Sequence, residues 1–135
     1  MKTMEGESLL GLRILVVDDE EIIRELLCEV LESEGFVTQA VESADLALEF
    51  LHRESSTVAL VLTDINMPGD IDGAELVKLS SRIWPSIPIV VMSGVATLQS
   101  AGIGNTAWFV RKPFAVDDMV ACLRNALGCP ASSIA

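Results

Sequence analysis

Short β-branched apolar runs alternate along the chain with longer stretches in which apolar residues recur every three or four positions. Short apolar runs are typical of strands, and the three- and four-residue spacing is typical of helices that pack on one face. Their alternation predicts a parallel sheet covered by helices. The expected strands are residues 13–17, 36–41, 58–63, 87–92 and 107–110.

Three of these runs are almost continuously apolar, namely residues 14–17, 58–62 and 87–91. A strand that is covered by helices on both faces buries both sets of side chains and therefore shows no polar alternation. We expect these three strands at the centre of the sheet.

Four helices are expected, and each has a start or stop signal in the sequence. The first should end near Gly35, because glycine readily adopts the conformation that terminates a helix. The second should be capped by Ser43, the third should end before Pro85, and the last should stop at Gly128.

The segment of residues 95–106 is expected to be a short or irregular helix, because Gly102, Gly104 and Asn105 interrupt it. A chain of 135 residues is the size of one domain. We expect that domain over residues 12–128, with tails at residues 1–11 and 129–135.

Composition narrows the classes of function. The net charge of −11 should repel nucleic-acid backbones and anionic lipid surfaces, so we expect neither nucleic-acid nor membrane binding. No apolar run approaches the ~20 residues that span a bilayer, and residues 1–11 lack the apolar stretch of a secretory signal. The expected location is the cytoplasm.

Polar residues stand where the predicted strands end. The first strand runs into Asp18 and Asp19, the third into Asp64 and Asn66, the fourth into Ser93, and the fifth leads to Lys112. The carboxyl ends of parallel strands share one edge of a sheet, where functional groups usually gather. Each residue alone would pass as a turn, a cap or a solvated group, but their joint occurrence at successive strand ends favours a site.

Clustered carboxylates repel one another and require a cation. Mg²⁺ suits such hard oxygen ligands. An aspartate beside that ion could attack a phosphoryl group and form an acyl phosphate, while the metal and a lysine neutralise the phosphoryl oxygens. The residues therefore predict a phosphoryl-transfer site.

From Ile14 through Leu127 the sequence resembles the receiver domain of bacterial response regulators. The matching motifs are ILVVDDE at residues 14–20, DINMPG at 64–69, MSG at 92–94 and KPF at 112–114. The resemblance implies a flavodoxin-like, doubly wound five-stranded parallel sheet of order 2-1-3-4-5, with helices on both faces.

The resemblance also implies a role for each matched residue. Asp64 would be the phosphoacceptor, and Asp18 and Asp19 would hold Mg²⁺ together with Asp64 and the backbone carbonyl of Asn66.

Two further residues would bind the phosphoryl group, and a third would change conformation in response to it. Ser93 would offer its hydroxyl, Lys112 would form a salt bridge, and Phe109 would be the switch aromatic. The Lys112–Pro113 peptide would be cis. Two departures from the family pattern stand out: the turn at residues 68–73 is one residue longer, and the stretch between Ser93 and Lys112 is about three residues shorter.

The leading interpretation is a single-domain signalling switch and not a turnover enzyme. Its expected partners are a histidine kinase or histidine phosphotransfer protein, a downstream protein target, and a second copy through segment 95–106, the fifth strand and the last helix. His52, the only histidine, is expected to be a solvated surface group and not a phosphohistidine relay.

Two other classes compete with this interpretation. A haloacid-dehalogenase-like phosphatase uses the same chemistry, but its nucleophile lies in an Asp-x-Asp motif, whereas Asp18 and Asp19 are adjacent. A flavodoxin-like cofactor binder would need a phosphate-cradling loop after the first strand, where the acidic residues 18–20 would repel a flavin phosphate.

Overall fold

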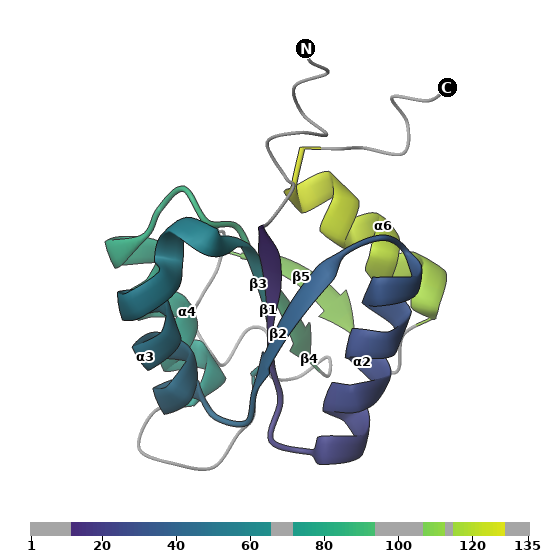
Figure 1. The fold of residues 1–135 in the computed structure, drawn as a ribbon, viewed down its shortest axis with the longest axis horizontal. Helices are drawn as coiled ribbons and strands as arrows, with labels where there is room; N and C mark the ends of the chain where they lie inside the picture. Colours follow the sequence, from purple (N-terminus) through teal and green to yellow (C-terminus); the bar gives the residue numbers. More distant parts are fainter. Residues whose placement is uncertain (1–11, 66–71, 94–106, 113–114, 129–135) are drawn as a thin grey trace.

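The computed structural model describes residues 12–65, 72–93, 107–112 and 115–128. Its five strands form one parallel sheet of order β2-β1-β3-β4-β5 (Figure 1). The predicted fold class and strand order are therefore confirmed. The strands are β1 (Arg13–Val17), β2 (Val37–Val41), β3 (Val58–Asp64), β4 (Ile89–Ser93) and β5 (Trp108–Arg111).

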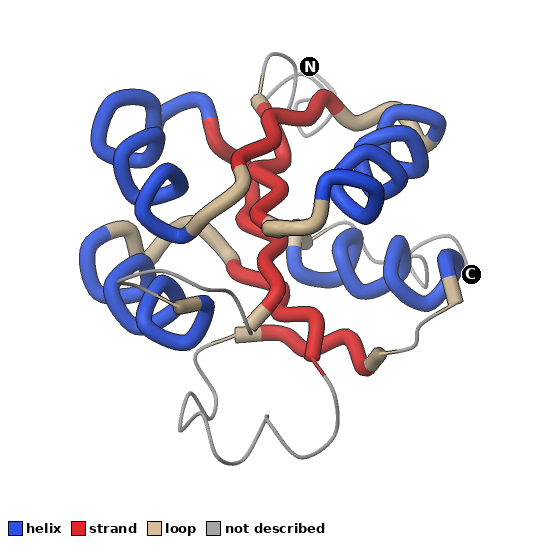
Figure 2. Tube along the Cα trace, turned by 90° about the horizontal axis from the view of Figure 1, so that it is seen from below, coloured by secondary structure: helices blue, strands red, loops and turns tan. Residues whose placement is uncertain are grey.

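Helices cover both faces of this sheet, so the domain has three layers (Figure 2). In Figure 1, α3 and α4 lie on one side and α2 and α6 on the other. A short 3₁₀ turn, η1 (Ser55–Thr57), leads into β3. The helices are α2 (Glu21–Ser33), α3 (Ala44–Glu54), α4 (Gly73–Ile83) and α6 (Val116–Ala126).

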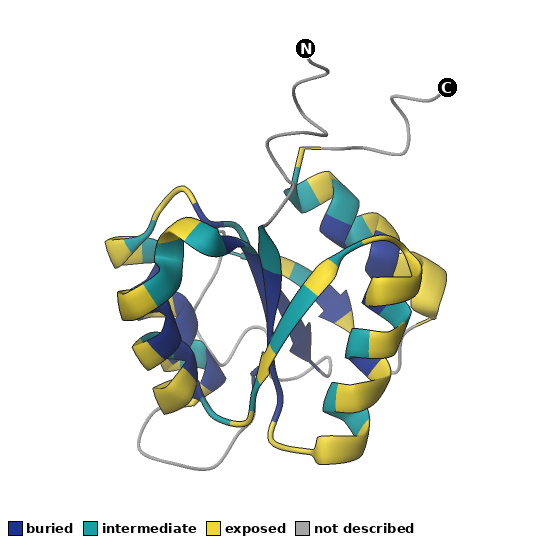
Figure 3. Cartoon of the chain, in the orientation of Figure 1, coloured by how far each residue is buried: buried dark blue, intermediate teal, exposed yellow. Residues whose placement is uncertain are grey.

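The core divides into two clusters, one on each face of the sheet. Leu15 and Val61 belong to the cluster under α3 and α4, while Val16 and Leu62 belong to the cluster under α2 and α6. Consecutive residues of a strand point to opposite faces, so a central strand must be apolar throughout. The central strands are buried along their length apart from Arg13 of β1 and Ala59 of β3, which are half-buried, and Figure 3 shows this burial.

The signals at the helix ends are confirmed where the structure describes them. The Ser43 side chain accepts a hydrogen bond from the backbone N–H of Leu46 at 3.1 Å, which caps α3. α4 ends at Ile83, two residues before Pro85, because the residue that precedes a proline avoids the helical conformation. Gly128 follows Leu127, the C-cap of α6, and has a φ of 79°.

Three strands begin later than predicted, and β5 is displaced by one residue to Trp108–Arg111. In β2 and β4, local hydrogen bonds engage the residues that were expected to open the strand. Phe36 donates its N–H to Leu31 at 3.0 Å, and Gly35 has a φ of 95°, so these residues close the end of α2. β2 therefore begins at Val37. The N–H of Ile87 binds the carbonyl of Trp84 at 3.0 Å in a turn, and Pro88 has no N–H, so β4 begins at Ile89.

Several expectations lie outside the described residues. They are the irregular helix at 95–106, residues 68–71 of the longer turn predicted at 68–73, the Lys112–Pro113 peptide and the two tails. Among the described helices, none is both long enough and apolar enough to cross a membrane.

Candidate functional site

Three carboxylates meet at the carboxyl edge of the sheet. Asp18 and Asp19 follow β1, Asp64 ends β3, and one oxygen from each lies within 4.8 Å of the others. β1 and β3 are paired neighbours, which brings their ends together. Asp18 is 1% exposed and Asp64 is 8% exposed, whereas Asp19 is on the surface. The site is thus a buried acidic pair with one solvated carboxylate at its mouth.

Asp18 is held by hydrogen bonds through its backbone and through one carboxylate oxygen. Its N–H donates to the carbonyl of Val41 at 3.2 Å, and its carbonyl accepts from Nη1 of Arg24 at 2.7 Å. Oδ1 accepts from the backbone N–H of Glu20 at 2.9 Å. Oδ2 is buried and has no hydrogen-bond partner among the described residues.

That buried oxygen is the observation that fits a metal ligand. An unpaired buried acceptor costs about 1–3 kcal/mol, and a cation would remove the cost. The donor set consists of carboxylate oxygens, which Mg²⁺ prefers. Asp18, Asp19 and Asp64 could therefore hold a divalent cation.

Burial raises the pKa of the Asp18 carboxyl, and the nearby charges of Asp64 and Asp19 act in the same direction. The N–H of Glu20 and the positive charge of Lys112 lower the pKa but do not offset the rise. Asp18 thus carries its negative charge at a cost in the metal-free protein, which is the electrostatic counterpart of its unpaired oxygen.

A lysine balances part of the negative charge. Nζ of Lys112 lies 2.9 Å from Oδ2 of Asp64, and the lysine side chain is 38% exposed. The backbone N–H of Lys112 donates to the carbonyl of Ser93 at 2.8 Å, which ties the end of β5 to the end of β4. Ser93 is 1% exposed. The ends of β3, β4 and β5 therefore converge on Asp64.

Gly73 supports the site from α4, and sequence analysis did not single it out. Its N–H donates to the carbonyl of Ile65 at 3.1 Å. A Cβ at this position would overlap the carbonyl oxygen of Asp64 and would lie 2.5 Å from Cα of Ile65. Only glycine lets the helix start approach the backbone so closely. The available signal was the Asp72-Gly73 pair before an amphipathic stretch.

Asp18, Asp19, Asp64, Ser93 and Lys112 are thus all placed at one edge of the sheet, as the sequence predicted. Their individual roles stay predictions.

The described contacts do not add the two other predicted site residues to this group. Asn66 lies outside the described residues. Phe109 is half-buried on β5, packs against the core cluster under α3 and α4, and its carbonyl lies 3.8 Å from Sγ of Cys122.

A five-stranded parallel sheet of order 2-1-3-4-5, with an acidic cluster and a lysine at its carboxyl edge, defines the receiver class of α/β domains. The sequence model of the response regulator receiver domain matches residues 14–124. The chain therefore belongs to the response regulator receiver domain family, and the resemblance found in the sequence is confirmed.

Named relatives agree with this membership. The chain is 36% identical over 119 residues to the nitrogen assimilation regulatory protein NtrX of Azorhizobium caulinodans, which covers 84% of this chain and 26% of that protein. It is 32% identical to the DNA-binding transcriptional regulator NtrC of Proteus hauseri, covering 84% and 24%. The crystal structure of the NtrX receiver domain from Brucella abortus superimposes with a TM-score of 0.76 at 34% identity, covering 85% and 98%.

The chain spans about a quarter of the length of the curated relatives that it matches. One of these relatives is named as DNA-binding, so the comparisons give no support to the expectation that nucleic acid is not a partner. That expectation rested on net charge alone.

Proposed function

We propose that this chain is the phosphoacceptor domain of a two-component or phosphorelay system, in which Asp64 takes a phosphoryl group from a phosphohistidine donor. The observation that supports this most directly is the setting of Asp64. Its Oδ2 lies 2.9 Å from Nζ of Lys112, and its carboxylate shares a 4.8 Å cluster with Asp18 and Asp19. A nucleophilic carboxylate, a cation to receive the phosphoryl oxygens and a set of metal ligands are thus adjacent.

The proposed reaction forms one bond and breaks one. An oxygen of Asp64 attacks phosphorus, the bond from phosphorus to the donor imidazole nitrogen breaks, and the imidazole keeps that electron pair. Lys112 turns from the carboxylate to a phosphoryl oxygen, and the Ser93 hydroxyl donates to another. Water later cleaves the acyl phosphate and restores the carboxylate.

Asp18 and Asp19 would hold Mg²⁺ with Asp64 and the carbonyl of Asn66. When bound, the ion supplies neutralisation of the phosphoryl oxygens. The chain's own contribution is to fix the ligands in advance, through the three hydrogen bonds to Asp18 and the register of β1 on β3. The domain accepts and loses its own phosphoryl group and does not turn over a substrate.

Response regulator receiver domains work with histidine kinases, and we propose a histidine kinase or a histidine phosphotransfer protein as the phosphodonor here. The proposed exchange takes place in the cytoplasm. Ser93 and Phe109 would pass the change to the surface that contains β5 and α6, where a downstream protein or a second copy would bind. Trp108 on β5 is 44% exposed and offers that surface a large apolar contact.

The test is intact-protein mass spectrometry after incubation with acetyl phosphate. The parent should gain the mass of one phosphoryl group with Mg²⁺ and none with a chelator, because the clustered negative charge opposes an incoming phosphate. Asp64→Asn should gain none. Asp72→Asn is the matched control, because Asn caps a helix as well as Asp does and Asp72 only caps α4.

Two results would contradict the proposal. One is labelling of Asp64→Asn to the extent of the parent. The other is sustained hydrolysis of a small phosphate ester such as p-nitrophenyl phosphate, which would favour the phosphatase alternative.

A further inference from the structure

Arg24 in the first turn of α2 contacts the acidic cluster through a backbone carbonyl and not through a carboxylate. Its Nη1 donates to the backbone carbonyl of Asp18 at 2.7 Å. We propose that Arg24 is a positioning residue, which fixes the Asp18–Asp19 peptide so that both carboxylates are set for a divalent cation. This inference rests on the proposed Mg²⁺ function of the site.

The bond from Arg24 to the Asp18 carbonyl acts on Asp19 as well as on Asp18. A peptide group is planar, so a bond to the carbonyl oxygen of Asp18 also fixes the direction in which the chain leaves toward Cα of Asp19. The backbone N–H and Oδ1 of Asp18 are hydrogen-bonded to Val41 and Glu20, and Oδ2 is the oxygen left for a cation. The bond from Arg24 therefore restricts the orientation of the peptide that joins Asp18 to Asp19.

The start of α2 would otherwise be weakly defined. Glu20 is the N-cap of α2, and its side chain makes no capping hydrogen bond. Most helix starts gain about 1 kcal/mol from such a cap. The backbone N–H of Arg24 donates to the carbonyl of Glu20 at 2.9 Å, and its guanidinium reaches back to Asp18. Arg24 therefore joins the helix start to the end of β1 in place of a capping side chain.

Arg24 binds a neutral carbonyl and not a carboxylate of the cluster. Among the described residues, Arg24 has no salt-bridge carboxylate within 4.0 Å, although it lies beside an acidic cluster. Lys112 differs, since its Nζ binds Oδ2 of Asp64. An arginine that donates to a neutral carbonyl forms a charge-assisted bond without taking a carboxylate oxygen from the metal. It orients the ligands and does not compete for them.

The experiment measures Mg²⁺ affinity by isothermal titration calorimetry on the full chain, with the metal-free melting temperature as a second measurement. Arg24→Met keeps the apolar stem of the side chain and removes the donor, and Arg24→Ala removes both. Arg24→Lys keeps a charge and one donor. The matched control is Arg53→Met, because the guanidinium of Arg53 lies over the ring of Phe50 and the substitution makes the same change in net charge.

Loss of a residue that orients a metal ligand typically weakens metal binding 10–100-fold. We expect Mg²⁺ to bind Arg24→Met and Arg24→Ala about tenfold more weakly than the parent. Arg24→Lys should lie between them and the parent, and Arg53→Met should match the parent. A merely structural role would lower the melting temperature without this order of affinities.

Parent-like affinity in either folded donor-less variant would overturn the inference, and so would equal weakening in Arg24→Lys and Arg24→Met. A parent that does not bind Mg²⁺ at all would instead overturn the proposed function, and the inference with it. The two failures are therefore distinguishable.

Discussion

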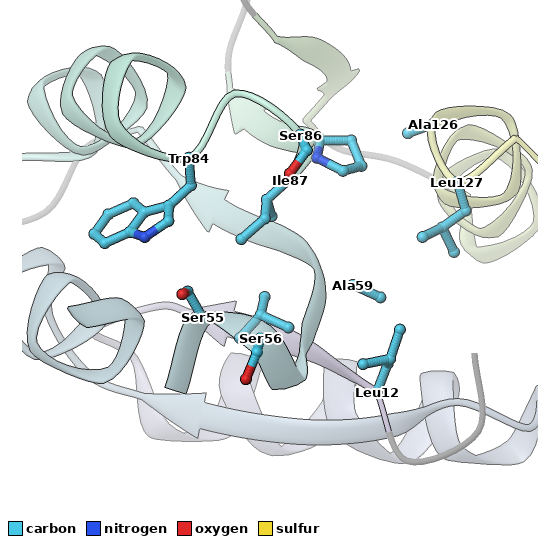
Figure 4. Close-up of a pocket in the computed structure, with 11 residues that line it drawn as sticks. Leu12, Ser55, Ser56, Ala59, Trp84, Ser86, Ile87, Ala126 and Leu127 are labelled. Carbon is cyan, nitrogen blue, oxygen red and sulfur yellow. The ribbon is translucent and has the colours of Figure 1, made fainter. Parts of the chain in front are cut away.

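The two edges of the same sheet differ in what they bury. At the carboxyl edge, the buried polar residues are Asp18, Thr63, Asp64 and Ser93. At the amino edge lies a hollow of about 490 Å³ (Figure 4). Trp84, Ile87 and Leu127 line it with the hydroxyls of Ser55 and Ser86, and its described lining contains no charged side chain.

The buried carboxylates at the carboxyl edge are not explained by the packing of the core. Both edges are formed by the same strands and the same apolar clusters, so the core does not require charge at either one. Burial of a carboxylate is costly unless it is paired. The cost of a buried carboxylate arises at the carboxyl edge, which supports the proposal that this edge binds a cation.

The largest expected effect on stability comes from adding a side chain at Gly73, where the start of α4 touches the backbone at the end of β3. Gly73→Ala would drive a methyl group into the backbone at Asp64 and Ile65. We expect a loss of about 3 kcal/mol in the free energy of unfolding, measured by urea denaturation.

Gly35→Ala is the control for this change, because its left-handed φ of 95° has open space around it. It should lose only about 1 kcal/mol. Equal losses at the two glycines would mean that the tight contact under Asp64 is not a constraint.

Lys112→Ala should leave Mg²⁺ binding intact and abolish the response to phosphorylation, because the lysine contacts Asp64 and is proposed to bind the phosphoryl oxygens and not the metal. Beryllofluoride, which mimics a phosphoryl group, provides the measurement through the fluorescence of Trp108. A Trp84→Phe background isolates that signal, since Trp84 belongs to the amino edge. A full beryllofluoride response in Lys112→Ala would show that the lysine is not needed for the response to phosphorylation.

Asp18→Asn should stabilise the metal-free protein at neutral pH. The folded pKa of Asp18 lies above its ordinary value of 3.8, so the parent loses stability as pH rises from 3.8 through that raised value and the loss persists above it. The advantage of the variant should vanish below pH 3.8 and reach its full size near neutrality.

Urea titrations with a chelator across this pH range measure the effect of Asp18→Asn. Added Mg²⁺ should stabilise the parent and not the variant. Asp19→Asn, which alters an exposed carboxylate, should change metal-free stability less. A parent more stable than Asp18→Asn at pH 7 without metal would contradict the claim that the buried charge is costly.

The smallest effect is expected at the amino edge. The ring of His52 meets the ring of Trp84 edge-on with centroids 4.9 Å apart, near the end of α3 that points away from the acidic cluster. His52→Ala should cost at most about 1 kcal/mol and leave the rate of labelling by acetyl phosphate unchanged. A slower rate would indicate that the two edges are coupled.

The sequence predicted most of the fold, because buried parallel strands and amphipathic helices leave distinct patterns. Its errors lay at element boundaries, where Phe36 serves a helix end and Pro88 lacks a donor. The location of the acidic residues, Ser93 and Lys112 at one edge of the sheet was predictable, because each of them follows or ends a strand.

The contacts of Arg24 and Gly73 were not predictable. Each depends on how a helix start approaches a strand end in space, and no periodicity in the sequence records that distance.

The most direct test of the central claim is to trap the acyl phosphate and map its position. Borohydride reduces an aspartyl phosphate to homoserine, so protein treated with acetyl phosphate and Mg²⁺, then reduced and digested, can be examined by peptide mass spectrometry. The account predicts conversion at Asp64 alone, and none when Mg²⁺ is withheld. Conversion at Asp18 or Asp19 with Asp64 unchanged would contradict it.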